Sequence, residues 1–416
     1  MRSVSTGEKG TLAIIGQGYV GLPLAMASAK SGWKVIGIDN NPKRIKDLNA
    51  GVSPIEDVAS SELISMINAD LYSVTNEFSF VSEAQIVVIC VPTPLNTSRE
   101  PDLTLLESAI KSLAPFLKEG TLIISESTSY PGTLRNFLIP LIKNHAPQTI
   151  DKLYFASAPE RVNPGDLIWK QSNTPRLVGG INVESLTRAL AFYQTICDVV
   201  KTVDTPEIAE AAKLLENTFR LVNIALINEF TQLCAKSGID VYGVIEAASS
   251  KPYGFMPFFP GVGVGGHCIP VDPLYLTWWA RQNNAKAEVV ELADSVNISM
   301  PAYVADRALS MVKSSTVTPR VLILGVAYKA GLADVRETPV EALFDNLLTK
   351  GTNVAWHDPL VANWRGDSIK IEDWDGDVAI LAVNQPGMDI EILIKKGIPI
   401  LDCTGSKRHM DKVTTL

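Results

Sequence analysis

The chain has 416 residues, of which 46% are hydrophobic and 20% charged, the composition of an ordinary folded protein with room for large cores. Its net charge of −8 at pH 7 argues against nucleic acid as the main partner but leaves room for an anionic ligand held by local basic residues. Because the five cysteines form no CxxC pair and no uncharged apolar run reaches about 18 residues, we expect a cytoplasmic protein without disulfides, a metal site or a membrane partner.

The first part of the chain alternates short apolar runs with helical spans. The runs that predict strands lie at residues 11–15, 35–38, 86–91, 122–124 and 153–156. Residues 22–31 predict the first helix. This alternation is typical of a parallel sheet covered by helices on both faces.

The middle of the chain is helical, and the last hundred residues alternate again. Residues 206–236 carry apolar side chains three or four positions apart, which predicts one long helix, and residues 285–313 predict another. Strand-like runs return at residues 321–324, 354–356, 378–383 and 398–401. We therefore predict an α/β fold in which two doubly wound, Rossmann-like parallel-sheet domains (1–200 and 316–416) are joined by a central helical domain (201–315).

Residues 16–21 (GQGYVG) follow the first predicted strand and open the first predicted helix. In this context the motif predicts a dinucleotide whose pyrophosphate lies on the helix N-terminus. Asp39 ends the next strand, where it would accept hydrogen bonds from ribose hydroxyls and disfavour a 2′-phosphate, so NAD is expected rather than NADP. Arg44 is a complication because it could accommodate such a phosphate, and FAD or a nucleotide sugar is the alternative ligand. The glycines of the motif are Gly16, Gly18 and Gly21.

Residues 261–273 (GVGVGGHCIPVDP) form a second glycine-rich segment, which ends on Cys268 and Asp272. Glycines let the backbone approach a ligand closely, and a thiol at the end of such a segment fits a nucleophile. The alternative is a tight turn that carries a buried structural thiol.

Three polar residues of the long helix, Lys213, Asn217 and Arg220, are spaced so that they share one face. The alternative is a solvated face, but Asn is a poor choice for an exposed helical site.

Three loops that follow predicted strands complete the candidate site, since open α/β sheets bind ligands at these ends. The first two loops are residues 125–128 (SEST) and residues 157–165 (SAPERVNPG). The alternative interpretations are a helix cap for the first and an ordinary proline-rich loop for the second. Lys329 and Arg336 frame the third loop, which could hold phosphates.

Taken together, the motifs resemble the UDP-glucose/GDP-mannose dehydrogenase family, whose members oxidise a nucleotide sugar at C6 to a uronic acid. The resemblance covers nearly the whole chain. The matching segments, in the family's order, are GQGYVGLPLA, VPTP, ESTSYPGT, PERVNPG, EAAKLLENTFR, GVGVGGHCIPVDP and AYKAGLADVRETP. It implies an NAD domain, a central helical domain that forms a homodimer, and a domain for the UDP-sugar substrate, in an enzyme of polysaccharide biosynthesis.

The resemblance also implies roles. Cys268 matches the nucleophile that traps the aldehyde as a thiohemiacetal and then a thioester, in a four-electron oxidation with two NAD. Lys213 and Asn217 match the residues that stabilise the oxyanion, and Asp272 one that orients or activates water. Glu160 matches a general base for thioester hydrolysis, and Thr128 a hydroxyl near the same water.

The remaining matches are binding positions. Those matching cofactor contacts are Gly16, Gly18, Tyr19, Val20, Gly21, Asp39, Arg44, Thr93, Thr128 and Arg336. Those matching substrate contacts are Arg161, Val162, Lys213, Asn217, Arg220, Gly265 and Lys329.

His267 and Ile269 flank the cysteine where UDP-glucose enzymes of the family usually carry serine and phenylalanine. The segment resembles the branch that acts on UDP-N-acetylhexosamines, so UDP-N-acetylglucosamine is the first expectation and UDP-N-acetylmannosamine the second. Residues 251–256 (KPYGFM) depart from the arginine-bearing pattern of many relatives, and His267 is a substrate contact, a thiolate partner or a packed loop residue. UDP-glucose or GDP-mannose as the substrate, an NAD-retaining isomerase, and a non-catalytic sensor are the competing interpretations.

Overall fold

The structure, a computed structural model, describes residues 9–55, 57–162, 166 and 168–416. These residues form two compact units, the first ending at Leu215 and the second beginning at Glu216. Of the predicted loop 157–165, Asn163, Pro164 and Gly165 lie outside the described residues.

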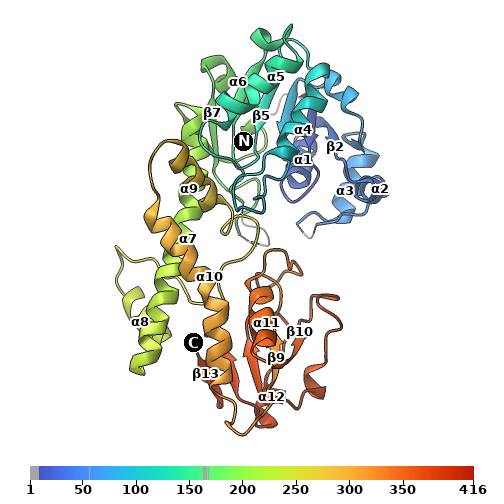
Figure 1. Cartoon of the computed structure of the whole chain (residues 1–416). Helices are drawn as coiled ribbons and strands as arrows, with labels where there is room; N and C mark the ends of the chain where they lie inside the picture. The colour runs from blue at the N-terminus through green and yellow to red at the C-terminus, as the bar shows by residue number, and fades with distance from the viewer. Residues whose placement is uncertain (1–8, 56, 163–165, 167) are drawn as a thin grey trace. The chain divides into compact units, whose positions relative to one another are not determined.

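The first unit is built on a sheet in the order β3-β2-β1-β4-β5-β6-β7-β8 (Figure 1). Its strands are β1 (Lys9–Ile15), β2 (Trp33–Ile38), β3 (Tyr72–Thr75), β4 (Ile86–Ile89), β5 (Leu122–Ser125), β6 (Tyr154–Ser157), β7 (Arg176–Gly180) and β8 (Val200–Val203). All neighbours are parallel except β6 and β7. The order 3-2-1-4-5-6 is that of dinucleotide-binding sheets, and it reverses between β1 and β4, where such sheets bind ligands.

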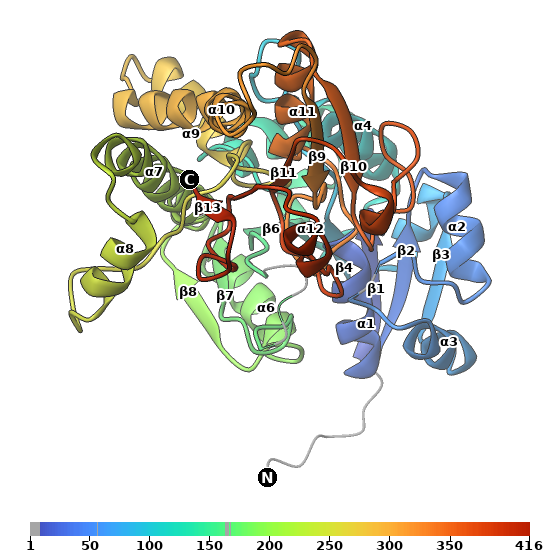
Figure 2. The same cartoon turned by 90° about the horizontal axis from the view of Figure 1, so that it is seen from below.

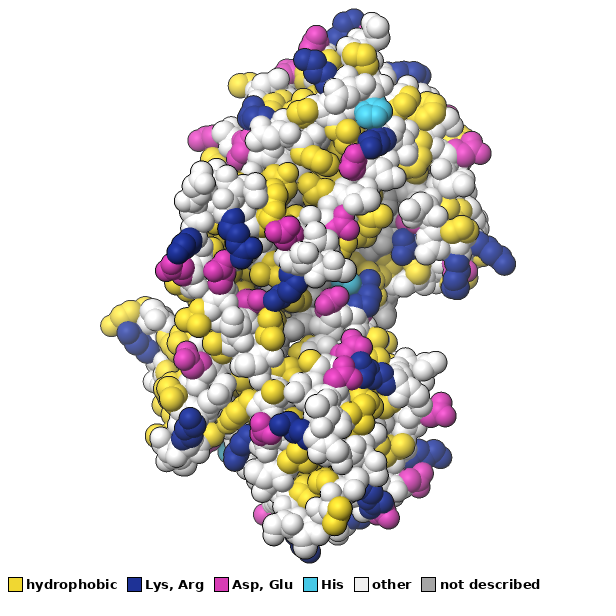
Figure 3. Space-filling view, in the orientation of Figure 1, with side chains coloured by type: hydrophobic (Ala, Val, Ile, Leu, Met, Phe, Trp, Pro, Cys, Tyr) yellow, Lys and Arg dark blue, Asp and Glu magenta, His cyan; other side chains and the backbone are white. Residues whose placement is uncertain are grey.

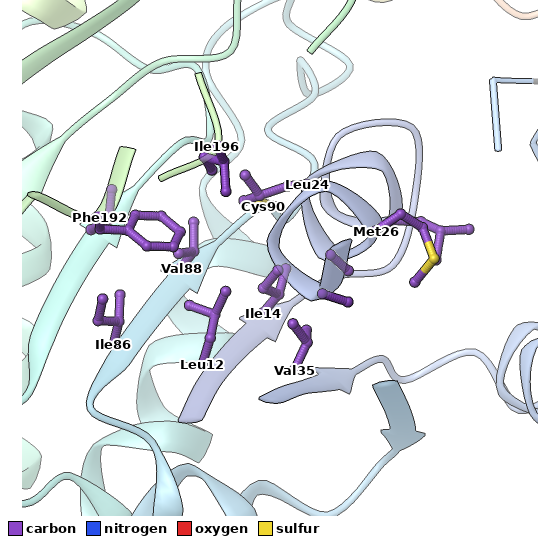
Figure 4. Packing of buried hydrophobic residues seen from close by; sticks show 14 of the residues in the cluster. Leu12, Ile14, Leu24, Met26, Val35, Ile86, Val88, Cys90, Phe192 and Ile196 are labelled. Atoms are coloured by element: carbon purple, nitrogen blue, oxygen red, sulfur yellow. The ribbon is translucent and has the colours of Figure 1, made fainter. Parts of the chain in front are cut away.

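Helices cover both faces of this sheet because successive residues of each strand point to opposite faces. Leu12 and Ile14 of β1 belong to one hydrophobic core, and Ala13 and Ile15 belong to the other. Figure 4 shows the first core, which packs against α1. The first core includes residues of α1 (Gly21–Lys30), α2 (Pro42–Asn49), α3 (Ser60–Asn68) and α6 (Val183–Tyr193), while the second includes residues of α4 (Thr104–Leu113) and α5 (Ile139–His145). Figure 2 shows α2 and α3 beside the β2–β3 edge.

The long helix predicted for residues 206–236 is confirmed as α7 (Pro206–Ser237), which has 32 residues. It starts in the first unit, where the buried Glu210 accepts hydrogen bonds from the backbone N of Gly132 (2.6 Å) and Leu134 (3.0 Å). Its later part belongs to the second unit, where Asn228 donates to Asn297 Oδ1 at 2.9 Å. None of the helices in the described ranges is long and apolar enough to cross a membrane.

The second unit continues with α8 (Val241–Ser249), α9 (Asp272–Gln282) and α10 (Glu288–Leu309). Helix α10 is shorter than the predicted span 285–313, and it begins after Asn284, whose φ of +55° is incompatible with a continuous helix.

A parallel sheet in the order β10-β9-β11-β12-β13 follows. Its elements are β9 (Arg320–Leu324), α11 (Pro339–Thr349), β10 (Asn353–His357), β11 (Val378–Leu381), α12 (Glu391–Lys395), β12 (Ile400–Asp402) and β13 (Val413–Thr415). Buried apolar clusters lie on both of its faces. The predicted fold class is thus confirmed: two Rossmann-like sheets with a helical segment between them in the chain.

Candidate active site

The glycine turn after β1 is built as a dinucleotide turn requires. Gly16 has φ +93°, and a Cβ there would lie 2.7 Å from the carbonyl oxygen of Cys90, so only glycine fits. At Gly21 a Cβ would lie 1.8 Å from the carbonyl oxygen of Gly16, which keeps the helix close to the strand. A Cβ on Gly18 would meet open space, the place where a pyrophosphate approaches the backbone. The turn therefore fits the NAD predicted from the sequence.

Asp39 at the end of β2 is tied to this turn. Its carboxylate, only 2% exposed, accepts hydrogen bonds from the backbone N of Gln17 (2.8 Å) and Asn41 (2.9 Å) and pairs with Arg44 Nη1 at 2.9 Å. From the sequence, Arg44 could bind a 2′-phosphate, but in the structure its charge is balanced by Asp39.

The other predicted cofactor residues of the first unit lie at the same edge of the sheet. Thr93 follows β4 and donates from Oγ1 to the carbonyl oxygen of Thr128, which follows β5, at 2.6 Å. Tyr19 is exposed and Val20 half-buried at the start of α1. The turn, Asp39, Thr93 and Thr128 are therefore gathered at the carboxyl ends of β1, β2, β4 and β5.

Glu160 follows β6 and is held from three sides. It accepts hydrogen bonds from the backbone N of Arg161 (2.6 Å) and Val162 (2.7 Å) and from Arg176 Nη2 (2.6 Å). The guanidinium of Arg176, 2% exposed, also lies 3.3 Å from Glu126 Oε2. The sequence predicted Glu160 but no role for Arg176 or Glu126. The signal was an arginine that opens the otherwise apolar strand β7.

The two carboxylates that share Arg176 differ in acidity. Burial raises the pKa of Glu126 to about 7, although Arg176 opposes this effect, and Tyr193 donates a hydrogen bond to the same carboxylate. Burial would also raise the pKa of Glu160, but Arg176, the backbone N–H of Val162 and the positive charge of Lys213 together lower it below its usual range. Glu160 therefore stays ionised at neutral pH, whereas Glu126 titrates there.

We predict that Glu126 makes unfolding pH-dependent. Its folded pKa of about 7 exceeds the unfolded value of 4.5, so its contribution to stability is complete below 4.5 and is lost as pH rises through 7. In Glu126→Gln the amide mimics the protonated acid, so the free energy of unfolding should fall less between about pH 5 and about pH 8 than in the unmodified protein. Urea titrations at both pH values measure this difference, and equal slopes for the two proteins would contradict the prediction.

The polar face of α7 is buried rather than solvated. Lys213 and Asn217 are 7% and 2% exposed, while the apolar Leu215 and Phe219 of the same helix are 66% and 46% exposed. The interpretation of the polar face as solvated is therefore wrong for Lys213 and Asn217. An ammonium group is buried only where other groups compensate for its desolvation, and Lys213 acts electrostatically on Glu160 within the first unit.

In the second unit, α7 meets the start of α9. Asn217 Nδ2 donates to Asp272 Oδ2, and Arg220 Nη2 donates to Asn217 Oδ1, both at 2.5 Å. Asp272, the buried first residue of α9, also donates from its backbone N to the carbonyl oxygen of Cys268 at 2.8 Å. The structure thus brings Asn217, Arg220, Asp272 and the backbone of Cys268 together.

Cys268 differs from the other cysteines in its exposure. It is half-buried, whereas Cys90, Cys197, Cys234 and Cys403 are buried, and burial raises the pKa of each of those four thiols. Within the described residues, all five lie outside disulfide bonds. No group of three or more His, Cys, Asp or Glu side chains in that part of the chain is arranged to hold a metal ion.

The glycines before Cys268 pack against protein, which the sequence did not anticipate. A Cβ on Gly265 would lie 2.8 Å from the carbonyl oxygen of Glu337, and a Cβ on Gly266 2.9 Å from the ring of Tyr328. The expectation that these glycines mainly clear a path for a ligand is therefore revised: at these two positions the backbone closes onto the loop after β9.

That loop carries the remaining predicted residues. Lys329 is half-buried, and Arg336 is exposed and pairs with Asp334 through Nε (2.8 Å) and Nη2 (2.6 Å). His267 Nε2 lies 3.9 Å from Asp334 Oδ2, and its pKa is lowered by burial and then by Arg336. His267 is thus a neighbour of the 328–337 loop and uncharged at neutral pH.

Comparison with known proteins decides the family. Residues 10–197 match the NAD binding domain of the UDP-glucose/GDP-mannose dehydrogenase family, residues 207–299 its central domain and residues 322–382 its UDP binding domain. The chain belongs to the UDP-glucose/GDP-mannose dehydrogenase family. It is accordingly an oxidoreductase with NAD as its cofactor, and it carries a UDP-binding domain.

Individual relatives are similar over most of the chain. A UDP-N-acetyl-D-mannosamine dehydrogenase of Methanococcus maripaludis is 36% identical over 84% of this chain and 79% of its own. A UDP-N-acetyl-D-glucosamine 6-dehydrogenase of Pseudomonas aeruginosa is 35% identical over 84% and 83%. The solved UDP-D-ManNAc dehydrogenase of Pyrococcus horikoshii, 31% identical, superposes with a TM-score of 0.86 over 95% of both chains.

Proposed function

We propose that this dehydrogenase oxidises the C6 hydroxymethyl group of a UDP-N-acetylhexosamine to a carboxylate. The observation that carries the proposal is the hydrogen-bonded set of Asn217, Arg220 and Asp272, which joins the polar face of α7 to the cysteine-bearing segment. Relatives that act on the glucosamine and mannosamine forms are 35% and 36% identical, so similarity does not separate the two sugars. UDP-N-acetyl-D-glucosamine is the first substrate to test and the mannosamine epimer the second.

The chemistry proposed for Cys268 is covalent. Bound NAD supplies the hydride acceptor for each of two oxidations. After the alcohol has become an aldehyde, the thiolate of Cys268 adds to C6 and forms a thiohemiacetal. Loss of a hydride from this adduct leaves a thioester, and water then releases the acid and returns the thiol. The covalent bond keeps the aldehyde from escaping between the two oxidations.

The polar face of α7 serves the charge that develops at C6. Lys213, as a buried cation, stabilises the oxyanion of the adduct, and Asn217 donates beside it. Asp272, which Asn217 holds, orients or activates the water that attacks the thioester.

Glu160 and Thr128 act in the hydrolysis step at the carboxyl edge of the first sheet. A general base is most effective when its pKa is near the working pH, and the pKa of Glu160 is lowered. We therefore propose that Glu160 orients the water and accepts its proton only as the attack proceeds, with the Thr128 hydroxyl as a second contact.

The proposed binding residues lie on the loops and on α7. In this proposal the substrate contacts are Arg161, Val162, Lys213, Asn217, Arg220, Gly265 and Lys329. The NAD contacts are Gly16, Gly18, Tyr19, Val20, Gly21, Asp39, Arg44, Thr93, Thr128 and Arg336. We also propose that the chain divides into an NAD domain (residues 1–200), a central helical domain (201–315) and a UDP-sugar domain (316–416).

Counting NADH per product tests the function. Purified protein is incubated with NAD and a panel of UDP- and GDP-sugars, and NADH absorbance and uronic acid are measured together. Two NADH per uronic acid from a UDP-N-acetylhexosamine support the proposal. One NADH per product, an epimerised sugar without net NADH, or sugar binding without turnover would instead indicate a two-electron enzyme, an isomerase or a sensor.

Asp39 is expected to set the preference for NAD over NADP. In Asp39→Ser the 2′-phosphate of NADP no longer meets a carboxylate, and Arg44 loses its counterion, so the ratio of kcat/KM values should shift toward NADP by at least about tenfold. Asp47→Ser, which removes a carboxylate from the following helix, is the control. An unchanged ratio in Asp39→Ser would count against the assigned contact.

We also propose that the enzyme is a homodimer formed through its central helices. Four apolar side chains of α7 follow a spacing of seven, four and three residues and are exposed in the single chain; they are Phe219 (46%), Leu226 (62%), Phe230 (38%) and Leu233 (57%). Such a stripe on one helix face is typical of helix pairing between chains. Figure 3 shows hydrophobic side chains among the charged ones on one face of the molecule.

The pair of changes Leu226→Asp and Leu233→Asp should therefore convert a dimer into a monomer. Light scattering after size exclusion measures the mass, and Leu348→Asp, at an exposed apolar position of α11, is the control. A monomeric unmodified protein, or a double variant that stays dimeric, would contradict the proposal.

A further inference from the structure

The loop after β9 is held in place by two buried side chains from the neighbouring strands. Asp358 follows β10, and its Oδ2 accepts hydrogen bonds from the backbone N of Val326 (2.9 Å) and Ala327 (3.3 Å). Gln385 follows β11, accepts from the backbone N of Gly331 (2.7 Å) and donates to the carbonyl oxygen of Leu332 (2.9 Å).

These two side chains also contact each other. Gln385 Nε2 lies 3.2 Å from Asp358 Oδ2, and the residues are 2% and 3% exposed. A carboxylate and an amide are costly to bury unless they form hydrogen bonds. Here both side chains form hydrogen bonds with the backbone of the same loop. The network therefore fixes the path of the backbone from Val326 to Leu332.

The same construction occurs in the NAD-binding unit. There Gly16 N donates to the carbonyl oxygen of Ile38 (2.7 Å), and here Gly325 N donates to that of His357 (2.8 Å). Both glycines have positive φ, +93° and +81°. A Cβ on either would collide with the carbonyl oxygen after the adjacent strand, that of Cys90 or Val383.

The acidic residues correspond as well. Asp39 Oδ2 accepts from Gln17 N just after its glycine, and Asp358 Oδ2 from Val326 N just after its own. Each aspartate also accepts through Oδ1 from the backbone N two residues onward, Asn41 or Leu360, at 2.9 Å.

The two turns differ in the distance to the next helix. Helix α1 starts five residues after Gly16, whereas α11 starts fourteen after Gly325, and Lys329 lies in the added loop. The second turn thus keeps the backbone framework of a nucleotide turn and extends it with a cationic loop.

We propose that Asp358 and Gln385 are positioning residues that hold the loop of residues 325–332 in the shape that binds the diphosphate of the UDP-sugar. The inference rests on the proposed function, since it takes a UDP-sugar as the ligand of this loop. It predicts that loss of either side chain weakens nucleotide binding and leaves the NAD turn of the first unit unaffected.

Calorimetry with UDP tests the proposal on the full-length protein. Asp358→Asn leaves one amide oxygen for the donors that now share the carboxylate, so the Kd for UDP should rise about tenfold, and Gln385→Ala should raise it by a smaller factor. In turnover, KM for the UDP-sugar should rise in both variants, while KM for NAD stays within about twofold.

Asp402→Asn is the matched control. Asp402 is 0% exposed at the end of β12 in the same sheet and accepts from the backbone N of Thr404 and Lys407, a different loop. The Asp402→Asn variant should have a lowered melting temperature, as should Asp358→Asn, but its affinity for UDP should be unchanged.

The outcomes are separable. If the unmodified protein binds no UDP, the proposed function fails. If it binds UDP but Asp358→Asn and Gln385→Ala bind equally well, or Asp402→Asn weakens binding as much, the positioning inference is overturned. If Asp358→Asn does not fold, Gln385→Ala decides by the same criterion.

Discussion

Replacement of Cys268 by alanine is expected to abolish formation of the uronic acid, with a loss of at least about a thousandfold in kcat. Without the thiol no thioester forms, so the second oxidation loses its covalent substrate. Binding of NAD and of the UDP-sugar should stay close to normal, because the remaining contacts of both ligands are unchanged. Stopped-flow absorbance and product analysis measure the effect.

Cys234→Ala is the control for this experiment, since Cys234 is a buried thiol of α7 that packs against α8. It should retain turnover even if it lowers the melting temperature. Turnover of Cys268→Ala near that of the unmodified enzyme would exclude the covalent route.

Lys213→Ala should lower kcat by about 100- to 1,000-fold, the cost of removing one donor from an oxyanion site. The larger part of the loss is expected in kcat because the negative charge exists only during the reaction, and the lost substrate contact should raise KM by a smaller factor. The pKa of Glu160 should also rise, since the charge of Lys213 is one of the effects that lower it. The pH dependence of kcat measures this second effect.

Lys236→Ala, an exposed lysine in the last turn of the same helix, should leave kcat unchanged. A loss below about threefold in Lys213→Ala would mean that the buried ammonium has only a structural role, because one donor at an oxyanion site contributes about 100-fold or more.

The sequence predicted those parts of the fold in which local pattern and tertiary role agree. The turn at Gly16 follows the apolar β1 directly in sequence, so the local pattern alone predicts strand, turn and helix. Strands β7 and β8 were missed because Arg176 opens one and the other is polar at Lys201 and Thr202. Their place in the sheet depends on partners far along the chain.

The site divides in the same way. Asn217 and Asp272 were found because each lies in a recognisable motif, but their hydrogen bond joins residues 55 positions apart. The Glu126–Arg176–Glu160 cluster stayed hidden because pairing between separate strands leaves no periodic signal. On α7 the periodicity was right about the helix but misleading about its exposure: several apolar positions face outward, and the polar ones are buried.

Two residues proposed for oxyanion stabilisation and two proposed for substrate binding alone sit on different kinds of scaffold. Lys213 and Asn217 are one turn apart on an unbroken helix, so their spacing of about 6 Å along its axis follows from helical pitch alone. Arg161 and Lys329, in contrast, lie on connections between elements. In evolution, these connections can change in length and composition to accept a new sugar, while the distance between the cation and the carboxamide is inherited intact.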